Sequence, residues 1–428
     1  MTRRKIHPCR QRGAAALIVV MVLFFIISMV AAYASRNLIF EQKTSANQYR
    51  ATQAFEAAEA GLEWAVAMLN GGRIDAACAA STDVTNDTFR TRYLDIDANT
   101  GSYTPRPWNN GGTNETSLWP SCVRTDAGWS CSCPANGAPV LAAPSGTGSY
   151  PAFRVRFEPV GQPGAVRVES VGCTRLVEAC LSEGQGTAGE AAARVSVVVS
   201  ISSALATPPA AALTVRGNLN VGASAIRLQN TDHASNGITA HAGGAATMTS
   251  PQLTTVPGTP TESSVVDNDA SLAALTGAQM FTSTFRMAKP TYKQQAAMVV
   301  LDDCATACSA KLAAAVQGYP GRVLWVEGDM TLDADVVLGS ATEPVLIVAT
   351  GNINLDAASV QIFGLLYSQS ADWANDGLGA VTVQGAAVAE GNFNGTGTPT
   401  IQYDPVILER LKLGTGTMVR VPGSWRDF

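Results

Sequence analysis

The hydrophobic pattern of the chain separates its first seventy residues from everything that follows. Basic residues near the N-terminus precede a run from Ala14 to Ala34 that carries no charge over 21 residues. At 1.5 Å per residue this run makes a helix of about 31 Å, enough to cross a hydrocarbon core of roughly 30 Å. Because Lys and Arg cluster before the run, we expect the N-terminus in the cytoplasm and the bulk of the chain outside. The pattern predicts one membrane-spanning helix.

The helical pattern continues beyond the apolar run. Apolar or small residues recur every three or four positions, at Tyr49, Thr52, Phe55, Ala58, Leu62, Ala65 or Val66, and Leu69. No proline occurs between Pro8 and Pro105, and Asn70-Gly71-Gly72 is a typical helix stop. We therefore predict one helix over 14–70, about 84 Å long, of which 14–34 lies in the membrane. The basic segment 1–13 precedes it as a leader.

The next part, 71–205, has the pattern of a small antiparallel β domain. Residues 71–149 are rich in turn formers, and strands follow at Ala152–Pro159, Ala165–Gly172 and Ala192–Ser202. The turn at Gly161–Gly164 makes a hairpin of the first two strands. We expect this sheet to pack on the end of the long helix as a head.

The remaining part, 206–428, contains a repeat. Gly217-Asn218, Gly328-Asp329, Gly351-Asn352 and Gly391-Asn392 each precede an apolar residue and a polar one, and short apolar runs lie between them. This pattern favours a parallel β-solenoid over a β-sandwich with Gly-Asn hairpins. A partly helical insertion is expected at about 230–320, and the final residues 421–428 either cap the solenoid or dock on the head.

The predicted fold class is therefore α+β and mostly β. A long N-terminal transmembrane helix packs on an antiparallel β-sheet head, and a C-terminal parallel β-solenoid-like domain follows. The composition, 46% hydrophobic and 15% charged, is that of a folded chain. Removing the five basic residues of the leader takes the net charge from −5 to −10. Nucleic acid is consequently not an expected partner.

The cysteines predict disulfides. Of nine, only Cys9 lies in the leader, and an even number in the exported part indicates an oxidising compartment. Short spacing suggests the pairs Cys173 with Cys180 and Cys304 with Cys308. The other four, with pairing left open, are expected to tie the segment between Cys78 and Cys133; they are Cys78, Cys122, Cys131 and Cys133.

Metal-binding and catalytic patterns are weak or incomplete. A zinc site would need a second close cysteine pair or nearby histidines, and only His7, His233 and His241 exist. Asp95–Asn99 begins like an EF-hand loop, but Thr100 and Arg106 stand where the loop requires Gly and Glu. The acids Asp329, Asp333, Asp335 and Asp356 lie at repeat turns, where Asp is expected for its backbone hydrogen bonds. We predict no enzyme activity, no catalytic residues, no metal and no cofactor.

The N-terminal residues also carry a family resemblance. The run Gln11 to Val20, then Glu41, then Ala54 to Leu62 resembles the N-terminal region of PilX-type minor pilins of type IV pili, over residues 10–70. The resemblance implies cleavage after Gly13 by prepilin peptidase and a methylated Ala14 as the new terminus. Major pilins have a glutamate at the fifth mature position, which here is Ile18. A subunit without that glutamate is expected at or near the pilus tip. Alternatively, Ile18 is simply one more membrane residue in a rare, loosely placed subunit.

The expected function is thus that of a non-catalytic minor pilin that primes pilus assembly. By resemblance its partners are other minor pilins, the major pilin, a large tip adhesin and prepilin peptidase, and it moves from the inner membrane to the pilus tip. Small and apolar residues of the helix are expected to pack in the membrane and the filament: Ala14, Ala15, Ala16, Leu17, Ile18, Ser28, Ala31 and Ala32.

Several alternatives stay open. An ordinary signal peptide cleaved before Ser35 or an uncleaved anchor would leave a membrane-tethered or secreted β-solenoid adhesin. A type II secretion tip pseudopilin also lacks the glutamate.

Overall fold

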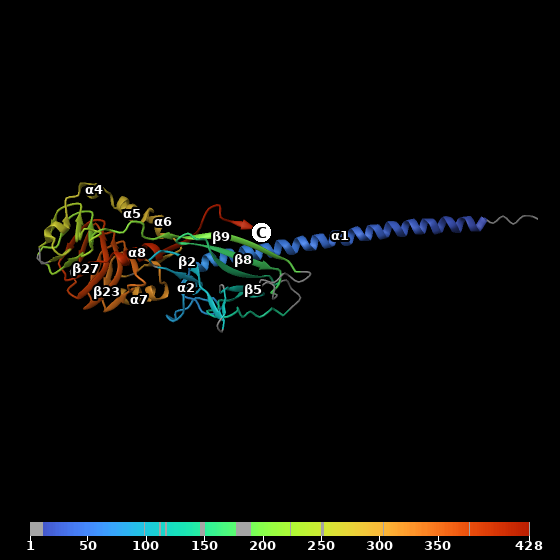
Figure 1. Ribbon diagram of the computed structural model, residues 1–428, viewed down its shortest axis with the longest axis horizontal. Helices are drawn as coiled ribbons and strands as arrows, with labels where there is room; N and C mark the ends of the chain where they lie inside the picture. The colour runs from blue at the N-terminus through green and yellow to red at the C-terminus, as the bar shows by residue number, and fades with distance from the viewer. Residues whose placement is uncertain are drawn as a thin grey trace, which may run out of the picture.

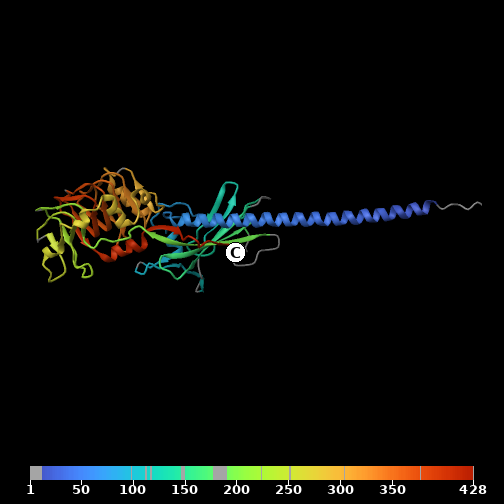
Figure 2. The ribbon, with the colours of Figure 1, turned by 90° about the horizontal axis from the view of Figure 1, so that it is seen from above.

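The computed structural model describes residues 12–97, 99–110, 113–115, 118–145, 150–176, 190–222, 224–249, 252–302, 304–375 and 377–427. The molecule is elongated, with the helix α1 (Arg12–Leu69) projecting from one end (Figure 1). A β-sheet head packs on the C-terminal half of α1, and a second β-rich region lies beyond the head (Figure 2). At 1.5 Å per residue α1 is about 87 Å long.

The head is an antiparallel sheet in which the strands follow the order β28-β9-β8-β7-β5-β6. The predicted strands occur with nearly the expected ends. One short helix and four small strands belong to the disulfide-tied segment between Cys78 and Cys133. The strands of the main sheet are β5 (Ser121–Thr125), β6 (Gly128–Ser132), β7 (Ala152–Pro159), β8 (Ala165–Cys173), β9 (Ala192–Ser203), β28 (Gly416–Arg420) and β29 (Arg426–Asp427), and the smaller elements are α2 (Phe89–Tyr93), β1 (Leu94–Ile96), β2 (Tyr103–Pro105), β3 (Trp108–Asn110) and β4 (Thr113–Glu115).

Small residues bring α1 close to the sheet. A Cβ atom at Gly172 would lie 2.2 Å from the carbonyl oxygen of Ala54, and one at Gly61 would lie 2.4 Å from the Ser170 hydroxyl. Leu62 and Leu69 are buried in the same contact. The predicted apolar face of the helix is thus present from Ala54 onward, whereas Tyr49 is 68% exposed because the sheet does not reach it.

The C-terminal strands belong to the head. β28 pairs antiparallel with β9, with Gly416 opposite Ser203, and β29 pairs with the beginning of the same strand. Trp425 packs edge-on against Phe55 of α1, with ring centroids 6.4 Å apart. The prediction had placed 206–428 in one C-terminal domain. The pairing instead makes residues 204–415 an insertion between two neighbouring strands, because the chain returns to complete the head sheet.

The inserted region is built on parallel strands. Its largest sheet contains β10 (Leu213–Val215), β12 (Arg227–Gln229), β13 (Ala240–Ala242), β15 (Leu253–Thr254), β16 (Val265–Val266), β17 (Met298–Leu301), β18 (Val323–Val326), β20 (Val336–Leu338), β21 (Val345–Ala349), β23 (Ser359–Ser368), β25 (Ala380–Ala389) and β27 (Thr400–Tyr403). Two smaller parallel sheets contain β11 (Leu219–Asn220), β14 (Ala246–Thr247), β24 (Asp372–Asn375) and β26 (Asn392–Gly395), and β19 (Met330–Leu332) with β22 (Ile353–Leu355). The chain passes from one sheet to another and back, so successive segments stack as rungs.

The order of these rungs differs from their order in the sequence. Moving along the chain, β18, β21, β23 and β25 pair in turn. The last rung along the chain, which contains β25, then pairs with the first rung, which contains β10, and Leu213 lies opposite Ala387. The rung containing β13 stacks on the outer side of β10. Both chain ends of the inserted region therefore meet at an internal seam between β10 and β25.

The Gly-Asn repeats form a ladder along this stack. The Asp329 carboxylate accepts the backbone N–H of Asn352 at 2.7 Å. The Asn392 side chain accepts the N–H of Asn218 at 2.8 Å, and Asn218 in turn accepts the N–H of Ala245 at 3.0 Å. Three of the preceding glycines leave no room for a side chain, since a Cβ at Gly391 would lie 1.8 Å from the carbonyl oxygen of Ala371, and one at Gly217 or Gly351 would lie 2.2 Å from a neighbouring atom. Gly328 instead has a positive φ of 79°. The repeat seen in the sequence is thus the contact between neighbouring rungs.

Helices cover the outside of the large sheet and one end of the stack. Buried residues of α5 and α6, with Leu408 and Leu411 of α8, pack on the outward side chains Trp325 and Tyr367. The predicted insertion at 230–320 contains both strands of the stack and helices. The helical elements are η2 (Thr261–Ser264), α4 (Ala270–Ala273), α5 (Gly277–Phe285), α6 (Lys289–Lys293), α7 (Cys308–Gly318) and α8 (Pro405–Gly414).

Candidate functional site

The N-terminal half of α1 is exposed at every position from residue 16 onward within the part of the chain that the structure describes. Leu17 is 65% exposed and Ile18 62%, and Ala16, Ser28 and Ala31 are also exposed. Gly13, Ala14 and Ala15 lie in the backbone of the same helix. The predicted packing residues thus share one free helix, which projects from the head (Figure 1).

This free segment is long and apolar enough to cross a membrane. Its apolar side chains have no partner within the described residues, and burying them in lipid or against other helices removes their surface from water. A wholly apolar helix surface is the expected form of a membrane span, not of a helix that lies on a soluble domain. The leader up to residue 11 falls outside the described residues.

Two buried arginines hold the other end of α1. Arg90 of α2 donates to the carbonyl oxygens of Leu69 at 3.2 Å and Gly416 at 3.0 Å. Arg322, which precedes β18, donates to the carbonyl oxygens of Leu69 at 3.1 Å and Gly71 at 2.7 Å. Each arginine is only 4% exposed. Carbonyls at a helix C-terminus carry partial negative charge, so they suit a buried cation.

Asn70 joins the same helix end to the returning strand. Its side-chain oxygen accepts the N–H of Met418 at 2.8 Å, and its amide donates to the carbonyl oxygen of Met418 at 2.8 Å. Arg420 of β28 also forms an ion pair with Glu63 of α1. The helix end is therefore bound to the head and to the inserted region together.

Disulfides tie the irregular part of the head and one end of the stack. Cys78 pairs with Cys133, and Cys122 pairs with Cys131 across β5 and β6. Cys304 is joined to Cys308 at the start of α7, the pair suggested by their spacing. Cys173 is disulfide-bonded as well, and its predicted partner Cys180 lies outside the described residues.

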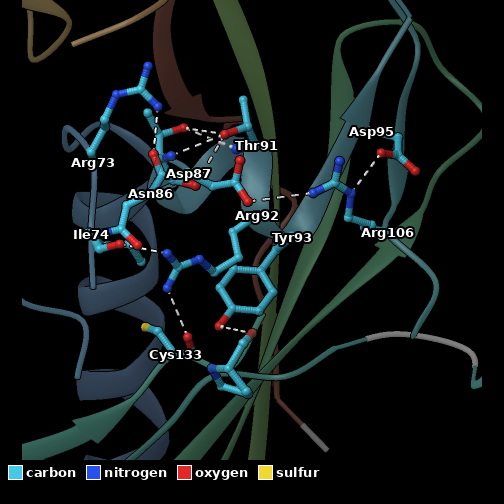
Figure 3. A network of polar contacts seen from close by, with 12 residues as sticks. Arg73, Ile74, Asn86, Asp87, Thr91, Arg92, Tyr93, Asp95, Arg106 and Cys133 are labelled. Atoms are coloured by element: carbon cyan, nitrogen blue, oxygen red, sulfur yellow. Dashed lines mark hydrogen bonds and ion pairs between the residues drawn. The ribbon is translucent and has the colours of Figure 1, made fainter. Parts of the chain in front are cut away.

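A third buried arginine supports the disulfide-tied segment. Arg92 donates to the carbonyl oxygens of Ile74 at 2.6 Å and Cys133 at 2.9 Å (Figure 3), and to that of Asp75 at 2.7 Å. Tyr93 donates its hydroxyl to the carbonyl oxygen of Pro134 at 3.2 Å. These contacts fix the chain on both sides of the Cys78–Cys133 bond.

Four of the acidic residues considered as catalytic or metal candidates, Asp97, Asp329, Asp333 and Asp335, accept hydrogen bonds from backbone N–H groups. Asp333 accepts the N–H of Ala307 at 2.8 Å, and Asp335 accepts the N–H of Ser359 at 2.8 Å. Asp97 accepts the N–H of Asn99 at 2.8 Å, and this hydrogen bond is the main cause that lowers the pKa of its carboxyl. Within the described residues no three His, Cys, Asp or Glu side chains gather as metal ligands.

The cluster of buried arginines was not predicted from the sequence. Arg90, Arg92 and Arg322 lie in segments without a motif, and Arg90 and Arg322 are brought together across the boundary between head and inserted region. Long-range pairing, which the local pattern does not encode, creates this part of the site.

A free apolar helix that continues into a β-sheet head is the arrangement of type IV pilin-like proteins, and the apolar half of α1 fits a membrane anchor. The family model described as PilX N-terminal matches residues 12–63, which confirms the resemblance over the helix itself. No curated protein matches the chain. Among solved structures, the crystal structure of the competence-associated pilin ComZ from Thermus thermophilus is similar at 12% identity, over 89% of this chain and 98% of that chain, with a TM-score of 0.23.

Proposed function

We propose that this protein is a minor pilin that primes assembly of a type IV pilus and lies at or near the pilus tip. The exposed apolar half of α1 carries the proposal, since it continues without a break into the half that packs under the head. In a filament this half would pack among the corresponding helices of other minor pilins and the major pilin. Its small residues, among them Ala16, Ser28 and Ala31, permit close helix contact.

The processing steps belong to the same proposal. Prepilin peptidase would cut between Gly13 and Ala14 on the cytoplasmic side of the inner membrane, and Ala14 would be methylated. The bulk of the chain would then lie in the periplasm until assembly. Gly13 and Ala14 both lie in α1, so the mature terminus would start the membrane helix directly.

The place at the tip rests on Ile18 and on the size of the inserted region. An isoleucine cannot pair with the terminal amine of a neighbouring subunit as a glutamate does. The rungs of residues 213–403 form, in our proposal, a β-solenoid that extends the subunit beyond the head. A large extension of this kind is accommodated most easily where no subunit stacks above it, and it offers a surface to a tip adhesin.

The N-terminal mass of the protein in sheared surface filaments tests the proposal. A methylated Ala14 terminus in the filament fraction, absent from a Gly13→Arg variant, is the expected result. A terminus at Ser35, or an intact leader found only in the membrane, would contradict it and favour a tethered adhesin.

Ile18 is tested separately. If its lack of charge favours the tip, Ile18→Glu should reduce tip location in labelled filaments and increase incorporation along the shaft. The matched variant Ile18→Leu should behave as the parent. Unchanged filament number and unchanged location in Ile18→Glu would refute the role of this position.

A further inference from the structure

A cleft lies where the head meets the inserted region. It has a volume of about 400 Å³ and is lined from the head by the segment around α2 and by Arg106, and from the inserted region by the turns before β18 and β21 and the end of α8. Its size is within the range of small-ligand pockets. Its charged lining includes five arginines, Arg73, Arg90, Arg106, Arg322 and Arg410.

The two innermost arginines have no carboxylate partner among the described residues. Arg90 and Arg322 hydrogen-bond to backbone carbonyls, as described above, and the Nε of Arg322 is buried without any hydrogen-bond partner in that part of the chain. Burial, together with the nearby charge of Arg90, lowers the pKa of Arg322 to about 9. Two adjacent buried cations held only by neutral groups are costly, and an anion beside them would offset that cost.

The rim of the cleft has a different character. Arg106 lies between Asp87 and Asp95, 3.7 Å and 3.1 Å away (Figure 3). Across the cleft, Glu343 is exposed, and Arg410 binds the carbonyl oxygen of Ala341. Carboxylates at the rim accept hydrogen bonds from hydroxyl groups but repel a multiply charged anion.

We propose that this cleft binds a sugar acid, a polyhydroxylated ligand with one carboxylate, as in a hexuronate. The carboxylate faces Arg90 and Arg322, whose buried positive charge attracts it, and the rim arginines Arg106 and Arg410 donate hydrogen bonds to it. The hydroxyls reach the rim carboxylates Asp87, Asp95 and Glu343. Phosphate fits less well, because the three rim carboxylates would oppose its second charge. The proposal goes beyond the assembly function and does not depend on incorporation into a filament.

Because both parts of the molecule line the cleft, a bound ligand links them. The head supplies Arg90 and Arg106, while the inserted region supplies Arg322, Glu343 and Arg410. Binding is therefore expected to slow amide hydrogen exchange on both sides, in 88–96 and in 340–344. The same sugar acid can be a free molecule or the terminal residue of an acidic glycan.

Isothermal titration of the full chain in detergent micelles with sodium D-glucuronate tests the proposal. We expect saturable binding, and Arg106→Gln and Arg410→Gln should each weaken it about tenfold, since hydrogen bonds to a charged group contribute that much. Both arginines lie at the rim, so these variants should fold. Arg227→Gln removes the same charge from the exposed edge of β12 and should leave the affinity unchanged.

Other probes decide the ligand class. D-Glucose should not bind, because it lacks the carboxylate, and inorganic phosphate and N-acetylglutamate should bind more weakly than glucuronate. Tighter binding of a trigalacturonate than of the monomer assigns the site to a glycan end, and equal binding assigns it to the free acid; both support the proposal. Glucose or phosphate binding as tightly as glucuronate would overturn it. So would N-acetylglutamate binding equally well, which indicates a protein carboxylate, or unaltered binding in the rim variants.

Discussion

At the residue scale, the end of α1 depends on polar groups that are buried and paired. Arg90, Arg322 and Asn70 together satisfy the last carbonyls of the helix and both backbone groups of Met418. A buried backbone group that loses its partner costs the free energy of removing it from water. The junction is therefore sensitive to single side chains.

Asn70→Ala is expected to lower the stability of the head by about 2 kcal/mol, because it leaves the N–H and the carbonyl of Met418 without partners. Urea unfolding followed by tryptophan fluorescence measures the change. Asn47→Ala, at an exposed position of the same helix, should change the stability by less than about 0.5 kcal/mol. Equal effects of the two variants would argue against a stabilising role of the Asn70 side chain at the end of α1.

Glu327 makes one contact dependent on pH. The hydrogen bond from Lys293 is the main cause that lowers the pKa of its carboxyl, against an opposing effect of burial, and Trp325 adds a second bond at 3.0 Å. Because the pKa of Glu327 is lower in the folded than in the unfolded protein, its carboxylate stabilises the fold. This stabilisation is fully present above the unfolded pKa of about 4.3 and is lost as the pH falls through the folded pKa.

The expected effect of Glu327→Gln is small because the group is partly exposed. At pH 7 the variant should lower Tm by about 1–2 °C, and at pH 3 the difference should vanish. Scanning calorimetry across this range measures both values, with Glu262→Gln as an exposed control. A difference that persists at pH 3 would mean that the contact is not ionic.

At the scale of elements, the predicted helices and strands agree best with the observed ones where a local hydrophobic period determines the secondary structure. The uncharged run and the absence of proline predicted α1. Alternation predicted β7 and β8, and a β-branched run predicted β9, each within one or two residues. The Gly-Asn repeats were recognised because Gly217, Gly351 and Gly391 each lie too close to the neighbouring rung to carry a Cβ. Arg90 and Arg322 were not, since their meeting depends on strands that pair far apart in the chain.

The two disulfides of the head should contribute unequally. Cys78 and Cys133 are 55 residues apart, whereas Cys122 and Cys131 are 9 apart. Loop-closure entropy gives about 4 kcal/mol for the longer loop and about 3 kcal/mol for the shorter.

Replacing Cys78 and Cys133 by alanine should therefore destabilise the head more than replacing Cys122 and Cys131. Thermal unfolding of the two double variants, each with the remaining cysteines oxidised, makes the comparison. A larger loss in the Cys122 and Cys131 variant would show that packing of those strands outweighs loop length.

At the scale of the whole molecule, the head and the inserted region are joined by two neighbouring strands. Gly416 lies opposite Ser203 in an antiparallel pair, so the chain leaves and re-enters the head at one place. Docking of residues 421–428 on the head was one of two expectations, and β29 lies there. The return of β28 was not expected, because this strand carries no signal that assigns it to a sheet formed two hundred residues earlier.

Replacing residues 204–415 by Asn-Gly should leave a folded head. A two-residue turn suits antiparallel neighbours, and the helix contacts of Gly61 and Gly172 remain. Circular dichroism should show a cooperative transition, lowered in temperature because Arg322 is lost from the junction. A linker of eight Gly and Ser residues serves as a second design, and failure of both to fold would contradict an insertion.

The seam between β10 and β25 has a mechanical consequence. A stack of rungs normally peels from a chain end at its outermost rung, one rung after another. Here both chain ends enter at an internal seam, and α7 with its disulfide closes one end of the array. A force between the outermost rungs and α1 therefore does not act on a chain end at the outside of the stack. Two covalent connections, which lead into adjacent strands of the head, share this force.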